Sequence, residues 1–436
     1  MTRSLRERAR SIAGHRDAGA MFWGFADQTF SSATNFSLAV IAGRVLGPSG
    51  LGTVTIGFSV YLIALGLQRR LLTEPVLIGA ADAVSARRQR GARHGLSISL
   101  IIGAGAASTA LVLSQLVPGF WGRGAWLVAP WILPALVQDL YRNVLFRDRR
   151  AVAAAVNDLA WLLAMLALVP IAWSVATDGA VMAAWGIGAV TATVLGCGQT
   201  RLLPSRPGAS IAWWRADIWP FAKWNAGAGI AANIGGNLGS WAVAAILGSG
   251  ALGGLRSAQA VFAPLTLITP AITLPGLPAV ARASARGFVE ARRLALVLSA
   301  VAFAATLAYV TVLALGGWRI LPFLFGDSFS RFRELIWPIA TGQLFVAAGI
   351  GMLVLIKAQR RGRLLFVNRT ISAGISIVLV TILAWAFGLP GAAWGTAAAG
   401  IVSTAILAIA ALRAPDPDPD PVAPIPVTAE RTSGQE

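Results

Sequence analysis

The chain has 436 residues, of which 56% are hydrophobic and only 12% are charged, a balance that a soluble protein of this length could not bury. The net charge of +18 would indicate nucleic acid binding in a soluble protein, but most basic residues lie in short segments between apolar runs, where they report membrane orientation. A soluble fold and a nucleic-acid partner are therefore excluded.

The first 20 residues contain five arginines and no apolar core, so we expect them to remain in the mature protein rather than act as a signal peptide. Leu5, Ala9 and Ile12 fall on one helical face, which predicts a basic amphipathic helix on an anionic membrane surface. A solvated basic tail is the alternative for this segment.

Apolar segments of about 20 residues, the length of a membrane span, follow along the rest of the chain. We expect about twelve spans, at 22–46, 51–79, 95–117, 125–146, 151–172, 180–200, 218–247, 252–280, 294–316, 332–356, 364–387 and 391–412. The sequence therefore predicts an all-α, polytopic membrane protein, followed by a disordered cytoplasmic tail at 413–436.

Basic residues alternate between the two sets of connecting segments. The set that includes the N-terminus holds 25 of the 36 Lys and Arg residues, whereas the opposite set holds three. By the positive-inside rule, both termini should be cytoplasmic in a multi-pass protein of the bacterial inner membrane.

Two short motifs recur about 200 residues apart, which indicates an internal repeat. The glycine-rich turn at 46–52 recurs at 247–253, and the Ala-Ala-Trp-Gly sequence at 183–186 recurs at 392–395. Since each half holds six spans, we expect two parallel six-helix bundles around a central cavity, at 21–200 and 217–412, joined by a cytoplasmic linker at 201–216.

Four segments, in this order and spacing, resemble the polysaccharide flippases of the multidrug, oligosaccharidyl-lipid and polysaccharide exporter superfamily. They are 43–52 (GRVLGPSGLG), 321–329 (LPFLFGDSF), 357–363 (KAQRRGR) and 387–395 (FGLPGAAWG). The resemblance implies an alternating-access transporter for an undecaprenyl-diphosphate-linked saccharide. It also implies polysaccharide polymerase and glycosyltransferases as partners, beside membrane lipids.

Basic residues within the expected spans outnumber acidic ones, which favours an anionic cargo, because arginine binds phosphate oxygens in a bidentate fashion. Candidate head-group contacts are Arg256, Arg69, Arg70, Arg44, Lys223 and Arg369. Residues near span ends can instead extend to water, and Arg69 and Arg70 become a cytoplasmic elbow if the second span ends earlier. Arg256, which has no basic neighbour, is the leading candidate.

Polar residues within the spans predict a wet cavity and a site for ion coupling. The candidates are Asp27, Gln28, Asn35, Glu74, Asp139, Asp158, Asn233 and Asn237. A carboxyl group buried in the membrane can carry a proton or a sodium ion, and no other cofactor is expected. Asp139 and Arg142, spaced i and i+3, are expected to form an ion pair on one helix face, which Asp158 could join.

Three other classes of function remain to be weighed. His15 and His94 are isolated, and Cys197 is the single cysteine, so neither a catalytic nor a metal site can be assembled from them and an enzyme is not expected. A drug-efflux carrier of the same superfamily would need an acidic cavity for cationic drugs. A non-transporting scaffold for polysaccharide-assembly enzymes is the third alternative.

Overall fold

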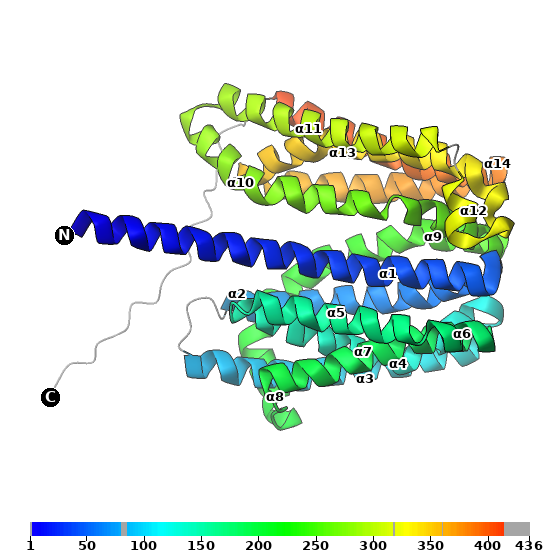
Figure 1. The fold of residues 1–436 in the computed structure, drawn as a ribbon, viewed down its shortest axis with the longest axis horizontal. Coiled ribbons are helices and arrows are strands. Elements are labelled where there is room, and N and C mark those ends of the chain that lie inside the picture. Colours follow the sequence, from blue (N-terminus) through cyan, green and yellow to red (C-terminus); the bar gives the residue numbers. More distant parts are fainter. Residues whose placement is uncertain (1, 80–84, 317–318, 360, 414–436) are drawn as a thin grey trace.

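The computed structural model describes residues 2–79, 85–316, 319–359 and 361–413, without the side chains of 2–18, 20–21, 78–79, 85–87, 221, 224–236 and 412. Every regular element in these ranges is a helix (Figure 1). Nine of the described helical segments are long and apolar enough to cross a membrane. The prediction of an all-α, polytopic membrane protein is confirmed.

Glycine turns explain how these segments give twelve crossings. Gly47, Gly248 and Gly388 have positive φ angles of 68°, 84° and 65° inside what would otherwise be continuous helices, and the chain reverses at each. A residue with a Cβ atom rarely adopts this conformation. The three reversals and the helix Gly119–Arg147 add four crossings to the nine segments, and 249–261 joins Ala263–Arg286 in one crossing, which gives the expected twelve.

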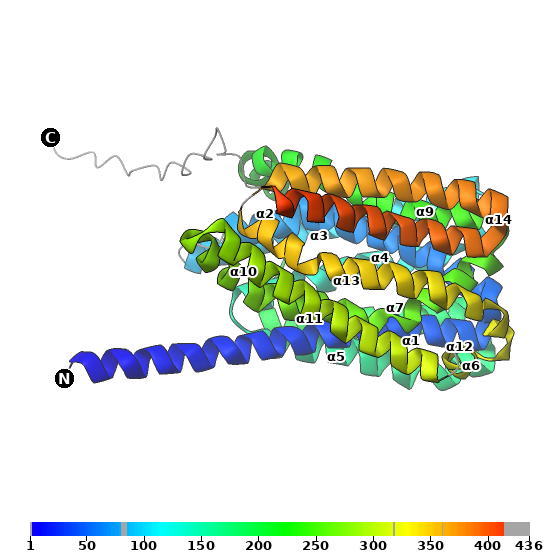
Figure 2. The ribbon, with the colours of Figure 1, turned by 90° about the horizontal axis from the view of Figure 1, so that it is seen from above.

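The first half of the chain forms one bundle. Its elements are α1 (Thr2–Gln68), η1 (Arg69–Thr73), α2 (Glu74–Gly79), α3 (Ser85–Leu116), α4 (Gly119–Arg147), α5 (Ala151–Ala167), α6 (Val169–Val175) and α7 (Asp178–Thr200). The helix α4 lies at its centre and packs against α1, α3 and α7. α1 continues without a break from Thr2, so its first part projects beyond the bundle (Figures 1 and 2).

The second half forms the other bundle. Its elements are α8 (Pro207–Trp213), η2 (Trp214–Ile218), α9 (Trp219–Val261), η3 (Ala263–Leu267), α10 (Ile268–Arg286), α11 (Phe288–Leu315), α12 (Ile320–Phe325), η4 (Asp327–Leu335), α13 (Ile336–Ala358) and α14 (Gly362–Leu412). α13 packs against α10, α11 and α14, and α14 packs against α9. The two bundles meet mainly where α1 lies along α9.

The two repeated glycine turns contact each other at the end of the molecule opposite the N-terminus, here called the turn end. A Cβ atom built on Gly52 would lie 1.9 Å from the carbonyl oxygen of Ser249, and one built on Gly253 would lie 1.9 Å from that of Pro48. The contact is therefore reciprocal, as a two-fold relation between the halves requires. Only glycine permits backbones to approach this closely.

Two of the segments that carried the family resemblance also meet at the turn end. Arg44 Nε donates a hydrogen bond of 2.7 Å to the carbonyl oxygen of Leu324, and Arg44 Nη2 donates to that of Phe323. A Cβ atom on Gly43 would meet the ring of Phe325. Arg44 therefore ties the first bundle to α12 of the second.

Candidate functional site

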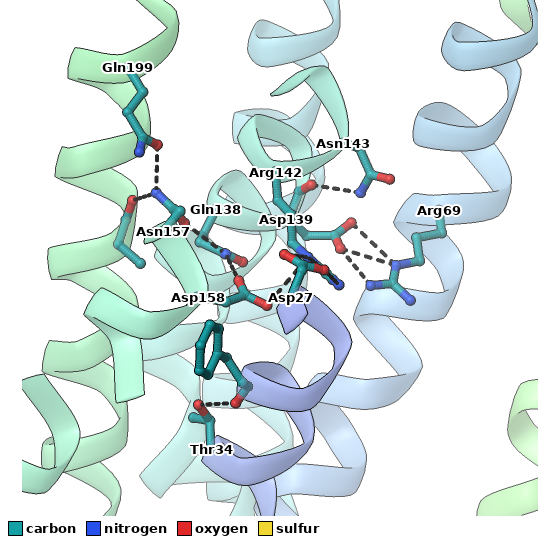
Figure 3. Close-up of polar contacts among 12 residues, drawn as sticks. Asp27, Thr34, Arg69, Gln138, Asp139, Arg142, Asn143, Asn157, Asp158 and Gln199 are labelled. Carbon is teal, nitrogen blue, oxygen red and sulfur yellow. Dashed lines mark hydrogen bonds and ion pairs between the residues drawn. The ribbon is translucent and has the colours of Figure 1, made fainter. Parts of the chain in front are cut away.

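A network of buried charges lies in the first bundle (Figure 3). Arg142 on α4 donates from Nε to both carboxylate oxygens of Asp27 on α1, at 3.0 and 2.9 Å, and from Nη2 to one of them. The same Nε lies 3.3 Å from Asp158 Oδ2 on α5, close enough for attraction but outside hydrogen-bond geometry. All three side chains are nearly inaccessible to solvent. Arg142 therefore joins three helices.

A second ion pair lies beside the first. Arg69 donates to Asp139 from Nε at 3.1 Å and from Nη2 at 2.6 Å. Arg69 begins η1, a π-helical turn that interrupts the helical pairing of the second crossing. The expected pair between Asp139 and Arg142 is therefore wrong, because each binds a partner on another helix. Asp158 does lie beside Arg142, but it joins the pair with Asp27.

Amide side chains surround the carboxylates. Gln138 Nε2 donates to Asp158 Oδ1 at 2.7 Å and to Asn157 Oδ1 at 2.9 Å, and Asn157 donates to the carbonyl oxygen of Ala192 on α7. Low-polarity surroundings strengthen such hydrogen bonds and make unpaired groups costly. The network should consequently be rigid.

The network opens onto a cavity of about 200 Å³. Its lining residues are Gln28, Ser31, Thr34, Asn35, Tyr61, Leu62, Leu65, Arg69, Gln138, Asp139, Arg142, Asp158, Trp161 and Trp185. They all belong to the first bundle. The charges of two arginines and two aspartates cancel in this lining. The network as a whole also includes Asp27, which lies behind the lining, and so has three carboxylates and two guanidinium groups.

The polar stripe on the first span lines this cavity inside the first bundle through Gln28 and Asn35, whereas the sequence predicts that it lines a cavity between the two bundles. Asp27 is buried against Arg142. Glu74 instead pairs with Arg70 one turn away on the same helix, at 3.1 Å. Asn237 is half-buried on α9, and the side chain of Asn233 lies outside the described residues.

The predicted head-group residues do not form one cluster. Arg69 is bound to Asp139, and Arg44 is bound to carbonyl groups at the turn end. Lys223 and Arg369 are exposed on α9 and α14. The two arginines that do line the cavity of the first bundle are balanced by two aspartates, so its lining has no net positive charge.

Arg256 is different. It lies on α9 eight residues beyond the turn at Gly248, or about 12 Å along the helix. It follows Gly253 by three residues, and so shares the side of α9 that meets α1. Arg256 is half-buried, and its guanidinium group has no hydrogen bond or ion pair with any described residue.

Sequence reasoning missed Gln138, Tyr61, Trp161 and Trp185 as cavity residues. The Trp185 ring is buried and packs edge-on against Tyr61 at 5.0 Å between ring centroids. Aromatic residues in an apolar span give no signal that separates a cavity wall from ordinary packing. No group of His, Cys, Asp or Glu in the described part of the chain is arranged to hold a metal ion.

No protein-family model and no curated protein sequence matches this chain. Among solved structures, it is similar to the lipid II flippase MurJ in an inward closed conformation, with a TM-score of 0.73, 12% identity, and coverage of 91% of this chain and 88% of that chain. It is also similar to an inward-facing multidrug resistance MATE family transporter of the MOP superfamily, with a TM-score of 0.67, 14% identity, and coverage of 89% and 97%.

A third similar structure is a MOP superfamily transporter from Pyrococcus furiosus, which is described as having a binding pocket of reverse polarity. The TM-score is 0.60 and the identity 13%, over 90% of this chain and 93% of that chain. Identities at this level show a shared fold alone. The chain has the fold of MOP superfamily transporters, and the narrower resemblance to polysaccharide flippases stays a prediction.

Proposed function

We propose that this protein is an alternating-access transporter that moves an undecaprenyl-diphosphate-linked saccharide across the bacterial cytoplasmic membrane. The head group enters the space between the two bundles from the basic, cytoplasmic end, while the polyprenyl tail remains in lipid. The two bundles then rock to expose the head group at the turn end. No chemical step is required, so the protein acts as a carrier and not as an enzyme.

The observation that carries this proposal is the guanidinium group of Arg256, which has no partner among the residues that the structure describes. A charge at such depth in the membrane costs about 2.5–3.5 kcal/mol on insertion scales, and it is usually retained for a ligand or a partner. The corresponding position in the first half, by the offset that relates Gly47 to Gly248, is Thr55. The charge is therefore a feature of one half only, next to the contact between α1 and α9.

The arginines of the first bundle have another role in this proposal. Arg69 and Arg142 are held by carboxylates, so a diphosphate would have to displace Asp139 or Asp27 to reach them. We assign the network of Asp27, Asp139 and Asp158 to the coupling proton or sodium ion, since its carboxylates outnumber its guanidinium groups.

The proposal is tested by reconstituting the chain in proteoliposomes with a fluorescent, short-chain polyprenyl-diphosphate saccharide. The fraction of this substrate that is accessible from outside the vesicles is then measured over time. Arg256→Gln should lower the initial rate roughly tenfold, since hydrogen bonds to a charged group contribute about 1.5–3 kcal/mol. Arg256→Lys should retain part of the rate. Arg293→Gln, which removes an exposed arginine outside the candidate site, serves as the control and should stay within about twofold.

An Arg256→Gln variant that flips the substrate at the wild-type rate would refute the assigned contact. If wild-type vesicles do not move the substrate at all, the cargo class is wrong. Loss of polysaccharide assembly in cells with no flipping in vesicles would favour the scaffold alternative.

Export of a cationic compound is the second candidate, and one observation favours it. The charged network beside the cavity of the first bundle has one more carboxylate than guanidinium groups, which would attract a cation. The same vesicles loaded with a cationic dye distinguish the two functions. Dye transport that Asp139→Asn abolishes and Arg256→Gln leaves intact would support this candidate over the flippase.

A further inference from the structure

A second cavity, of about 380 Å³, lies at the end of the first bundle that is opposite the turn end, where the basic connecting segments gather. It is formed by the start of α3 and the ends of α4 and α7. Its lining residues are Arg88, Gln89, Val144, Arg147, Asp148, Arg149, Thr200 and Leu202. Its volume falls within the range of ligand sites, about 300–1,000 Å³. The transport path proposed above does not use it.

The lining has an excess of positive charge that the described residues leave uncompensated. Arg147 Nε donates to Asp148 Oδ1 at 2.9 Å, and Arg147 Nη2 lies 3.3 Å from Asp148 Oδ2, so the acidic residue is already engaged. The guanidinium groups of Arg88 and Arg149 have no hydrogen bond or ion pair within the described part of the chain. Two positive charges therefore line one concave surface.

Capping of the helix ends does not account for these two arginines. Basic residues often neutralise the carbonyl groups at helix C-termini. Here the last carbonyls of α4 accept backbone N–H groups of Asp148, Arg149 and Arg150, and Gln199 at the end of α7 accepts from the side chain of Arg150 at 2.7 Å. The capping role belongs to Arg150, which leaves Arg88 and Arg149 available.

The backbone at this cavity is also unusual. Arg149 and Arg201 adopt φ angles of 58° and 53°, a left-handed conformation that residues other than glycine seldom take. Such residues concentrate at ligand sites, where the surrounding structure maintains them. Arg149 itself lines the cavity.

Neighbouring tryptophans place the cavity at the level of lipid head groups. The Trp213 ring of α8 stacks on His94 of α3 at 5.3 Å, and Trp214 donates to the carbonyl oxygen of Leu71. Tryptophans gather where the hydrocarbon meets the head groups. Arg88 precedes His94 by six residues on α3, so it lies about 9 Å farther along the helix toward water.

We propose that this cavity is a binding site for a phosphate group, which Arg88 and Arg149 clamp while Val144 and Leu202 form its apolar wall. Basic pockets between membrane helices on the cytoplasmic side bind anionic lipid head groups by this chemistry. The phosphate group of an anionic phospholipid and free phosphate would both bind the arginines in this way, but only the lipid would also contact the apolar wall. The site is independent of the proposed cargo.

Native mass spectrometry of the full chain from nanodiscs that contain phosphatidylglycerol and phosphatidylcholine tests the site. The pocket variant is Arg88→Gln with Arg149→Gln. Its matched control is Arg90→Gln with Arg293→Gln, which removes two exposed arginines outside the cavity and therefore changes the net charge equally. We expect the pocket variant to bind phosphatidylglycerol at least tenfold more weakly, with less than a threefold change in the control.

Equilibrium dialysis with radiolabelled inorganic phosphate is the second arm. Loss of phosphate binding in the pocket variant, with unchanged lipid retention, would support the site and assign it to a soluble phosphate. Equal losses in both variants, or no loss in either arm, would overturn it. If the double variant does not fold, Arg149→Gln alone replaces it, since the side chain of Arg149 is exposed and has no protein partner in the described ranges.

Discussion

Closure at the turn end should be highly sensitive to one methyl group. In the structure, a Cβ atom on Gly52 would lie 1.9 Å from the carbonyl oxygen of Ser249, and real Cβ atoms essentially never approach closer than 3.0 Å. Gly52→Ala therefore forces α1 and α9 apart by about 1.1 Å or more. Because the opposing atom belongs to the backbone, no side-chain rotation relieves the overlap.

Overpacking of this kind typically costs about 1–3 kcal/mol. The cost applies only to the closed state, in which the two turns touch, and not to the open state. The ratio of molecules closed at the turn end to molecules open there should therefore fall roughly 5- to 150-fold. Gly253→Ala should give the same shift, since its Cβ atom would meet the carbonyl oxygen of Pro48 at the same 1.9 Å.

Disulfide cross-linking can measure this population. A Cβ atom on Gly250 would lie 3.3 Å from the hydroxyl oxygen of Ser49, so Ser49→Cys with Gly250→Cys meets the distance needs of a disulfide in the closed state. Cys197→Ser removes the single native cysteine. Adding Gly52→Ala to this background should slow cross-linking by the factor given above.

Gly105→Ala is the control, because nothing lies within 4 Å of the Cβ position of Gly105. Equal cross-linking rates in the Gly52→Ala and Gly105→Ala backgrounds would refute the role of the glycine contact. A slower rate in Gly52→Ala with an unchanged rate in Gly253→Ala would refute its reciprocity.

Two predictions concern buried polar groups of the first bundle. Arg142→Gln should lower the free energy of unfolding of the purified protein by about 3–5 kcal/mol, since it leaves buried carboxylates uncompensated. Adding Asp27→Asn should recover part of that loss. Additive effects of the two substitutions in denaturant unfolding would contradict the pairing. Arg123→Gln, which removes a largely exposed guanidinium group from its pair with Asp178, should cost at most about 1 kcal/mol. Gln68→Leu should cost about 1–3 kcal/mol, because the carbonyl of Leu136 and the buried hydroxyl of Ser99 each lose a short hydrogen bond and keep only the 3.5 Å one between them. An unchanged unfolding midpoint would contradict this.

The glycine turns were predictable, and the pairing of charges was not. Gly47 and Gly248 stand in matching motifs and adopt nearly the same backbone conformation, because a local sequence determines a local turn. Asp139 and Arg142 are neighbours on one helix, yet they bind Arg69 and Asp27 across helices. A single sequence does not reveal which faces of two helices meet.

The second repeated motif shows a similar limit. Trp185 is 1% exposed inside the first bundle, whereas Trp394, its counterpart by sequence, is 48% exposed. The glycines that follow them do behave alike, since a Cβ atom on Gly186 or Gly395 would overlap a neighbouring helix. The repeated motif therefore marks close helix packing in both halves, but it does not determine the surroundings of the large side chain.

The glycine contact at the turn end consists of backbone carbonyls and Cα atoms, which neither titrate nor bind counterions. A change in pH or in sodium concentration consequently has no direct point of action there. If transport depends on either ion, the effect must travel from Asp27 to Gly47 along α1, about 30 Å of helix without a break. α1 would then transmit the change as a rigid helix, from the ion-binding carboxylate of Asp27 to the uncharged glycine contact at the turn end.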